Sequence, residues 1–186
     1  MIGIGMLLCA CPGDDQPPII GAKVELGTGT TDYAPLLAEA TLDLIAGPQG
    51  GHHFIVHARM RRMAPGDPMR PGQAQNPAST FAAYAEDGHQ LDLMNPPYRL
   101  GYVMAADGWY ELPSGRILQL EETEVAALDG VRVRIVAIVR DAFGAEGNDE
   151  RWIIARPGVL LPGEDAGPAD AAMPTTDGAR ATDGAP

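Results

Sequence analysis

Short runs in which apolar and polar residues alternate occur throughout the middle of the chain. A period of two places the apolar side chains on one face of a β-strand. Such runs span residues 23–26, 41–46, 52–60, 79–85, 98–104, 109–112, 116–120, 131–140 and 151–155. Steps such as Asp87-Gly88 and Asp107-Gly108 separate several of them and are typical of tight turns. About eight or nine short strands joined in this way predict an all-β sandwich.

Two of these runs allow a more detailed prediction. The odd-numbered residues of 131–140 are all apolar, whereas the other face has arginines at its ends and apolar residues in its middle. We therefore expect a central strand that is partly covered on both sides. Residues 109–112 and 116–120 flank a Pro-Ser-Gly step and are expected to form a hairpin. Short helices at 32–39 and 121–128 remain alternatives, and 63–77, with four prolines, is expected to be a loop.

The last two predicted strands resemble a known class of domain. Leu128-Asp129-Gly130 leads into 131–140, and a further turn leads into a strand at 151–155. This arrangement is similar to the end of immunoglobulin-like, cadherin-like and fibronectin-III-like domains. The resemblance implies a single antiparallel β-sandwich of the immunoglobulin-like class. No tyrosine occupies the start of the long strand and no cysteine pair lies in the body of the chain, so the resemblance is to the class and not to a particular family.

The N-terminal segment carries a second resemblance. Residues 1–8 are apolar and uncharged, and Leu8-Cys9-Ala10-Cys11 resembles the lipobox of bacterial lipoproteins. The resemblance implies that Cys11 becomes the lipidated first residue after cleavage. A signal peptide also has a positively charged start, which is missing here, so we expect the true start codon to lie upstream. The alternatives are a buried first strand or a metal or redox pair formed by Cys9 and Cys11, although two thiolates are too few for a structural zinc site.

These patterns divide the chain into three parts. Residues 1–18 are interpreted as a truncated lipoprotein signal and tether, and 19–156 as the β-sandwich domain. Residues 157–186 consist mainly of Pro, Gly, Ala, Asp and Thr. Such a tail has too little apolar surface to offset its ordering entropy, and it is expected to be disordered.

The charge of the chain excludes some partners. Lys and Arg number 13 against 25 Asp and Glu, which gives a net charge of -12. This balance argues against nucleic acid as a partner. It also argues against electrostatic binding to anionic lipid headgroups.

Three of the four histidines, His52, His53 and His57, lie within six residues, and several methionines follow them. Histidine and methionine are the ligands of periplasmic copper proteins. On a strand, however, residues four apart are about 13 Å apart, so a metal site would need partners from other strands, such as His89. The alternative is that His53 and His57 lie on the solvent side of the strand beside Arg59.

Other groups suggest weaker sites. Asp141, Asn148 and Asp149 surround a Gly-rich turn, where oxygen ligands could hold Ca²⁺, or they belong to an ordinary acidic hairpin. Trp109-Tyr110 is either a sugar-stacking platform or part of a packed hairpin. The chain has one basic cluster, formed by Arg59, Arg61, Arg62 and Arg70. This cluster would bind an acidic partner or a phosphate, or would protect a strand edge from aggregation.

Taken together, these features predict a non-enzymatic envelope lipoprotein, held at the outer membrane by a lipid on Cys11. Its β-sandwich would be a binding or scaffolding domain with an envelope protein as partner and without a required cofactor. The alternative is a periplasmic copper-binding lipoprotein that uses His52, His53, His57 and nearby methionines.

Overall fold

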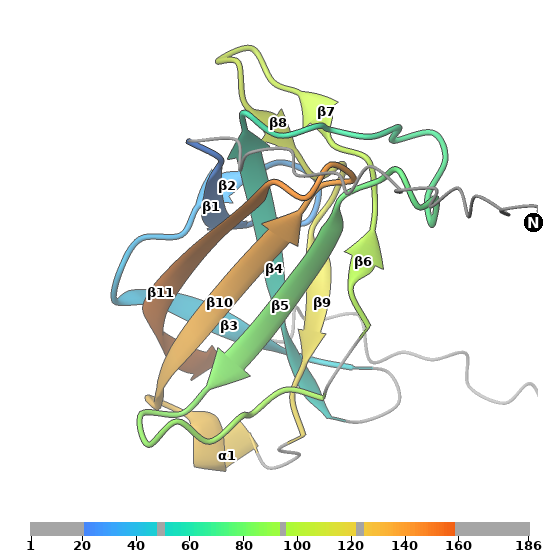
Figure 1. The fold of residues 1–186 in the computed structure, drawn as a ribbon. Helices are drawn as coiled ribbons and strands as arrows, with labels where there is room; N and C mark the ends of the chain where they lie inside the picture. The colour runs from blue at the N-terminus through green and yellow to red at the C-terminus, as the bar shows by residue number, and fades with distance from the viewer. Residues whose placement is uncertain (1–20, 48–50, 94–95, 122–124, 159–186) are drawn as a thin grey trace, which may run out of the picture.

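The computed structural model of the chain describes residues 21–47, 51–93, 96–121 and 125–158. Strands dominate these residues, as the alternating pattern predicts, and form a curled mixed sheet (Figure 1). The strands are β1 (Lys23–Thr28), β2 (Ala34–Pro35), β3 (Ala40–Ala46), β4 (His52–Arg61), β5 (Ala78–Tyr84), β6 (Tyr98–Arg99), β7 (Val103–Met104), β8 (Tyr110–Glu111), β9 (Arg116–Gln119), β10 (Arg132–Arg140) and β11 (Glu146–Pro157). The helix α1 spans Val125–Leu128.

The hydrogen-bonded strand order is β2-β1-β4-β3-β11-β10-β5-β6, and β8 and β9 also pair with β4. Every pair is antiparallel except β11 with β3, which is parallel. The sheet is therefore mixed, whereas the sequence pattern predicts purely antiparallel pairing. Parallel strands need a long connection, and β3 and β11 lie far apart in the chain.

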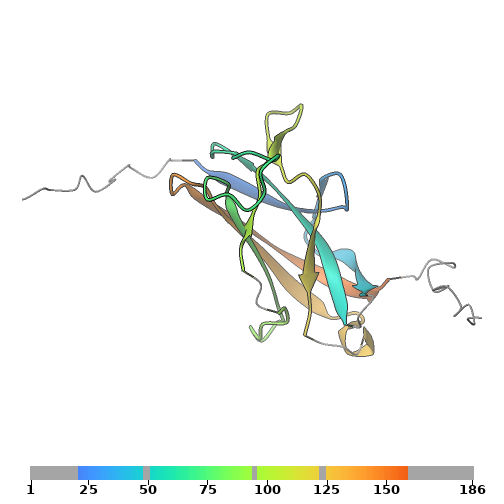
Figure 2. The same cartoon turned by 90° about the vertical axis from the view of Figure 1, so that its right-hand side faces the viewer.

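The curl of the sheet brings its edges together (Figure 2). The main chain at Leu91 joins β5 to the end of β9, because its N–H donates to Ala83 O (2.8 Å) and its carbonyl accepts from Glu121 N (2.8 Å). The Tyr98 hydroxyl of β6 donates to Ile117 O of β9 at 3.1 Å. The parts of the sheet around β10 and around β4 thus face each other across one core.

The core is formed by the inward faces of the long strands. Val133, Ile135, Ala137 and Val139 of β10 are all 0% exposed, and β5 and β11 flank this strand on either side. Burial of a side chain the size of isoleucine contributes about 1.5–3 kcal/mol. The predicted central position of β10 is confirmed, and its outer face is partly covered: Arg132, Arg134 and Val136 are half-buried, whereas Ile138 is 40% exposed.

Two local predictions are wrong. The segment 32–39 contains the short strand β2 instead of a helix. Residues 109–120 do not form a hairpin, because β8 and β9 both pair with β4, at Arg59–Met60 and at residues 53–56. Between them the chain leaves β4 and packs on another loop, where a Cβ atom on Gly115 would lie 2.2 Å from Gly29 O. The Pro-Ser-Gly step is thus a break in one strand edge and not a turn.

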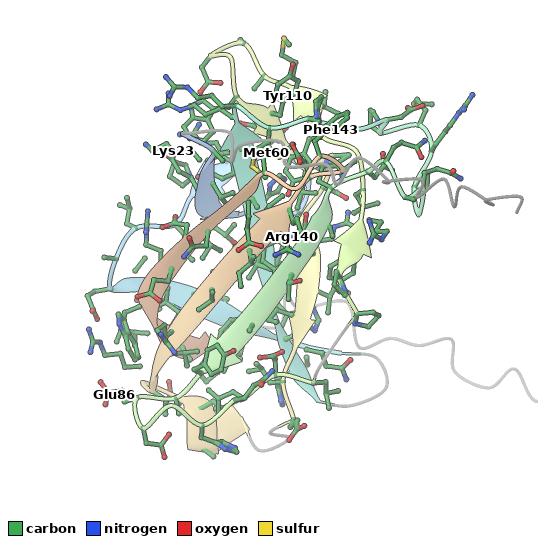
Figure 3. All side chains as sticks on the ribbon, in the orientation of Figure 1. Lys23, Met60, Glu86, Tyr110, Arg140 and Phe143 are labelled. Atoms are coloured by element: carbon green, nitrogen blue, oxygen red, sulfur yellow. The ribbon has the colours of Figure 1, made fainter. Side chains whose placement is uncertain are left out.

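The molecule has two distinct ends (Figure 3). We define the apical end by the start of β1, the end of β4, the loop 62–77, the β7–β8 hairpin and the turn 141–145. We define the basal end by the start of β4, residues 85–93, α1 and the start of β10. Lys23, Tyr110 and Phe143 mark the apical end, and Glu86 lies at the basal end.

Some predictions fall outside the described residues. Cys11 and the rest of the predicted signal and tether lie there, as does the tail from residue 159 onward. Among the described residues, no helix has the length and apolar character needed to span a bilayer.

Candidate functional site

The structure places the three clustered histidines apart. His52 and His53 are neighbours in β4 and therefore point to opposite faces. His57 shares the face of His53 but lies four residues away, about 13 Å along the strand. No group of three or more His, Cys, Asp or Glu side chains that could hold a metal ion occurs within the described ranges. A copper site at these histidines stays a prediction, and its missing ligands would have to come from elsewhere.

His57 is buried, which corrects the expectation that it faces solvent. The side chain is 0% exposed, and its ring meets that of Tyr33 edge-on at a centroid distance of 5.6 Å. Tyr33 can cross β1 because Gly27 has no side chain, and a Cβ atom there would lie 2.3 Å from the tyrosine ring. The loop before β2 therefore covers the outer face of β4. Burial lowers the pKa of His57 below 6.5, so the imidazole is neutral at pH 7.

The three residues of the predicted calcium site also have separate positions. Asp141 accepts hydrogen bonds from the backbone N–H groups of Ala64, Phe143 and Ala145 at 2.8–2.9 Å. Asp149 accepts a hydrogen bond from Leu26 N at 2.8 Å and lies opposite Ala137, four residues before Asp141 along β10. That offset is about 13 Å along the strand.

The third residue of this set is Asn148, which is exposed and lies opposite Ile138. Asp141 therefore acts as a hydrogen-bond acceptor within the turn, and Asp149 acts as one between β1 and β11. The structure does not bring the three side chains together around one point.

The basic cluster is partly a packed unit, which we call the Trp109 face. Arg59 and Arg61 lie on the same face of β4, with their guanidinium carbons 4.5 Å and 4.7 Å from the centre of the Trp109 ring. Arg59 also binds Glu25 through two hydrogen bonds of 2.7 Å and 2.9 Å. Trp109 is only 7% exposed. Its ring is covered by cations, so this residue packs in the fold and is not an open sugar-stacking platform.

In the Trp109 face, the charge of Arg59 is compensated by Glu25 and Asp107, whereas Arg61 has no carboxylate partner among the described residues. Partial burial acts to raise the pKa of Glu25, but the hydrogen bonds and charges of Arg59 and Lys23 outweigh it and hold this pKa below its ordinary value. An open groove next to this face is lined by residues that include Asp32, Met104 and Glu111. Burial, aided by the charge of Asp107, raises the pKa of Glu111.

Large apolar side chains gather at the apical end. Met69 is 85% exposed, Phe143 67%, Met104 64% and Val103 48%. They come from three separate segments, the loop 62–77, the β10–β11 turn and β7. Each looks like an isolated surface residue in the sequence, so no sequence signal reveals that they share one end.

The apical loops that carry these side chains are held by buried polar groups. Asn76 is 0% exposed, accepts a hydrogen bond from Asp67 N (2.8 Å) and donates one to Arg70 O (2.7 Å). Asp141 ties the start of the same loop to the β10–β11 turn. The exposure of Met69 and Phe143 is therefore a feature of a well-bonded surface.

The two ends also differ in charge. Arg61 and Arg62 are exposed at the apical end and have no carboxylate partner within the described part of the chain. At the basal end Arg132 pairs with both Glu39 and Glu86. Three other basal carboxylates have no arginine partner among the described residues. They belong to Asp87, Glu121 and Asp129.

Comparison of the chain with protein-family models, with curated proteins and with solved structures gave no match. The apical end is the candidate site because of its own geometry and composition.

Proposed function

We propose that this chain is a lipid-anchored envelope protein, attached through Cys11, whose β domain is a non-enzymatic binding or scaffolding module. The observation that carries the proposal is the set of exposed apolar side chains at the apical end. Contiguous apolar surface on a soluble domain is typical of contact sites. The apical loops place several exposed apolar side chains at one end of the domain, and Asn76 and Asp141 fix these loops.

The buried polar groups support a binding role over a catalytic one. Asn76, Asp92 and Asp141 bond mainly to the main chain, and the Ser79 hydroxyl bonds to that of Tyr102 at 2.8 Å. Catalysis needs such groups to converge in one pocket with free donors or acceptors. Here they are used to hold loops and strands in place.

The finer description of the fold belongs to the same proposal. In an immunoglobulin-like sandwich, two sheets pack face to face. The approach of β1 to β11 supports this class, since a Cβ atom on Gly147 would lie 2.8 Å from a methyl group of Val24. An outer-membrane location and an envelope protein as partner follow from the lipobox resemblance.

The mass of the mature protein tests the anchor. The chain is expressed from its natural gene in a Gram-negative host, and intact mass and detergent partitioning are measured. We expect a product that begins at acylated Cys11 and enters the detergent phase. Cys11→Ala should abolish both properties, whereas the matched change Cys9→Ala should leave them. An unprocessed, water-soluble wild-type product would contradict the proposal.

Copper binding is the second candidate function. His52 Nδ1 and His57 Nε2 are buried ring nitrogens without a hydrogen-bond partner among the described residues, as expected of unoccupied ligands. They lie five residues apart, however, which places them on opposite faces of β4. We therefore expect no tight 1:1 Cu²⁺ binding in a competition titration of the purified chain. Tight binding that is lost in both His53→Ala and His57→Ala would establish the copper function instead.

A further inference from the structure

The apical end combines three features that are found together at membrane surfaces. It carries exposed apolar side chains, arginines without a carboxylate partner, and the point where the chain enters the domain at residue 21. We propose that the apical end docks against an anionic bilayer beside the lipid anchor, so that Phe143, Met69 and Met104 enter the headgroup region. This inference rests on the proposed anchoring at Cys11 and identifies the surface that the anchored domain contacts.

The length of the tether favours this orientation. Twelve peptide steps separate Cys11 from Lys23, and they span at most about 40 Å when fully extended. The ten residues of β4 run the length of the domain, which is about 33 Å. A tether attached at the apical end keeps that end closest to the membrane. Contact through the basal end would require a nearly extended tether running back along the whole domain.

The distribution of charge supports an anionic surface as the partner. Arg61 and Arg62 lie beside the entry point of the chain, and a Cβ atom on Gly21 would meet the Arg62 side chain at 2.5 Å. The net charge of -12, which argues against electrostatic binding of the chain to anionic lipid, is not distributed evenly over the domain. Two carboxylates without an arginine partner among the described residues, Asp32 and Glu111, line the groove beside Met104. Three others, on Asp87, Glu121 and Asp129, lie at the basal end, about 30 Å away. The Debye length at physiological salt is about 8 Å, so their repulsion is screened at that distance.

The apolar side chains add a contribution that salt does not screen. Interfacial protein segments bury their apolar face about 5–10 Å into the boundary between headgroups and acyl chains. The lipid on Cys11 attaches the chain to the bilayer, and the apical side chains decide which face of the domain contacts it. These side chains, held rigidly by Asn76 and Asp141, enter the interface at little entropic cost.

Fluorescence quenching by lipid tests the orientation without relying on natural acylation. In a Cys9→Ala chain the remaining cysteine is Cys11, which can be coupled to a maleimide lipid in vesicles. The vesicles contain phosphatidylcholine with brominated acyl chains and about one third phosphatidylglycerol. Tryptophan is introduced at the apical end by Phe143→Trp and, as the matched control, at the basal end by Glu86→Trp. Emission of the parent chain, which contains Trp109 and Trp152, is subtracted.

We expect strong quenching in the Phe143→Trp chain and little in the Glu86→Trp chain. Replacement of Arg61 and Arg62 by glutamine should weaken the docking equilibrium about fivefold for each arginine removed, with a matching loss of quenching. Equal quenching at both ends, or none at either, would overturn the docking proposal. In the second case the apical end would be free for a protein partner. If the mass measurement shows no acylation, only the proposed natural anchor is overturned. The chain coupled to lipid through Cys11 still tests whether the apical end docks on the bilayer.

Discussion

The connections at the two ends of this small β domain are held in place in different ways. At the basal end the main chain at Leu91 joins β5 to the end of β9, and the exposed side chains include Glu86, Asp87 and His89 as well as Leu93, which is 38% exposed. At the apical end Asn76 and Asp141 hold long loops from within, and the exposed surface is rich in apolar side chains. Both ends are ordered, so their different surfaces do not result from loose packing. The comparison teaches that apolar exposure on firmly bonded loops indicates a contact surface.

The largest expected effect comes from removing the support of the apical loops. Asp141→Ala leaves three backbone N–H groups without their acceptor, and we expect a loss of about 3 kcal/mol in the free energy of unfolding. Urea unfolding measures it. Asp141→Asn keeps one acceptor oxygen and should lose less. Equal stability of the alanine variant and the wild type would show that the apical loops are not held in this way.

The corresponding change at the basal end should have a smaller effect. Asp92 is 3% exposed and accepts hydrogen bonds from Ala83 N (2.6 Å) and Gln90 Nε2 (3.3 Å). It supports fewer backbone donors than Asp141, and Leu91 adds main-chain bonds of its own. We expect Asp92→Ala to reduce the free energy of unfolding by about 2 kcal/mol. A loss larger than that of Asp141→Ala in the same urea series would reverse the proposed difference between the ends.

Between the two ends, His57 should make stability depend on pH. Burial lowers its pKa in the folded protein below 6.5, so the unfolded chain binds a proton at higher pH than the folded chain. The folded protein is therefore most stable well above about pH 6.5, the pKa of the unfolded imidazole, and loses stability as the pH falls through this value. Burial of His53 acts in the same direction.

Urea unfolding at a series of pH values measures this effect, and His57→Leu should reduce the loss. His89→Ala, at an exposed position, is the control and should retain it. An unchanged pH profile in His57→Leu would assign the effect to other groups.

The smallest effect is expected from the apical surface itself. Phe143 and Met69 are mostly exposed, so replacing either by serine should change the free energy of unfolding by less than about 0.5 kcal/mol. The same changes should weaken membrane docking. A large loss of stability in either variant would mean that the side chain belongs to the core and that the exposed surface is smaller than described.

The sequence pattern gives most of the strands because alternation is a local property. Residues 131–140 have one apolar face, and β10 buries that face completely. The same pattern contains no information about which strands pair with each other. It predicts that β8 and β9 pair with each other, whereas both lie along β4, because pairing is decided by the course of the whole sheet.

The candidate site was less accessible to sequence reasoning than the fold. His57 alternates like a solvent-facing residue, and only the crossing of Tyr33 over Gly27 shows that it is buried. Asp141 and Asp149 look like ligands of one ion because a turn lies between them. The register of β10 and β11 separates them and gives each a backbone donor.

By itself, the sequence determined the all-β class, the positions of the longer strands and the glycine turns, because side-chain period and backbone freedom are local properties of the chain. It also supplies the lipobox resemblance at Cys11. Tertiary structure alone decided which strands pair, which histidine is buried and that Met69, Met104 and Phe143 share one end. These are contacts between distant segments, and their free energy depends on how the sheet curls and closes.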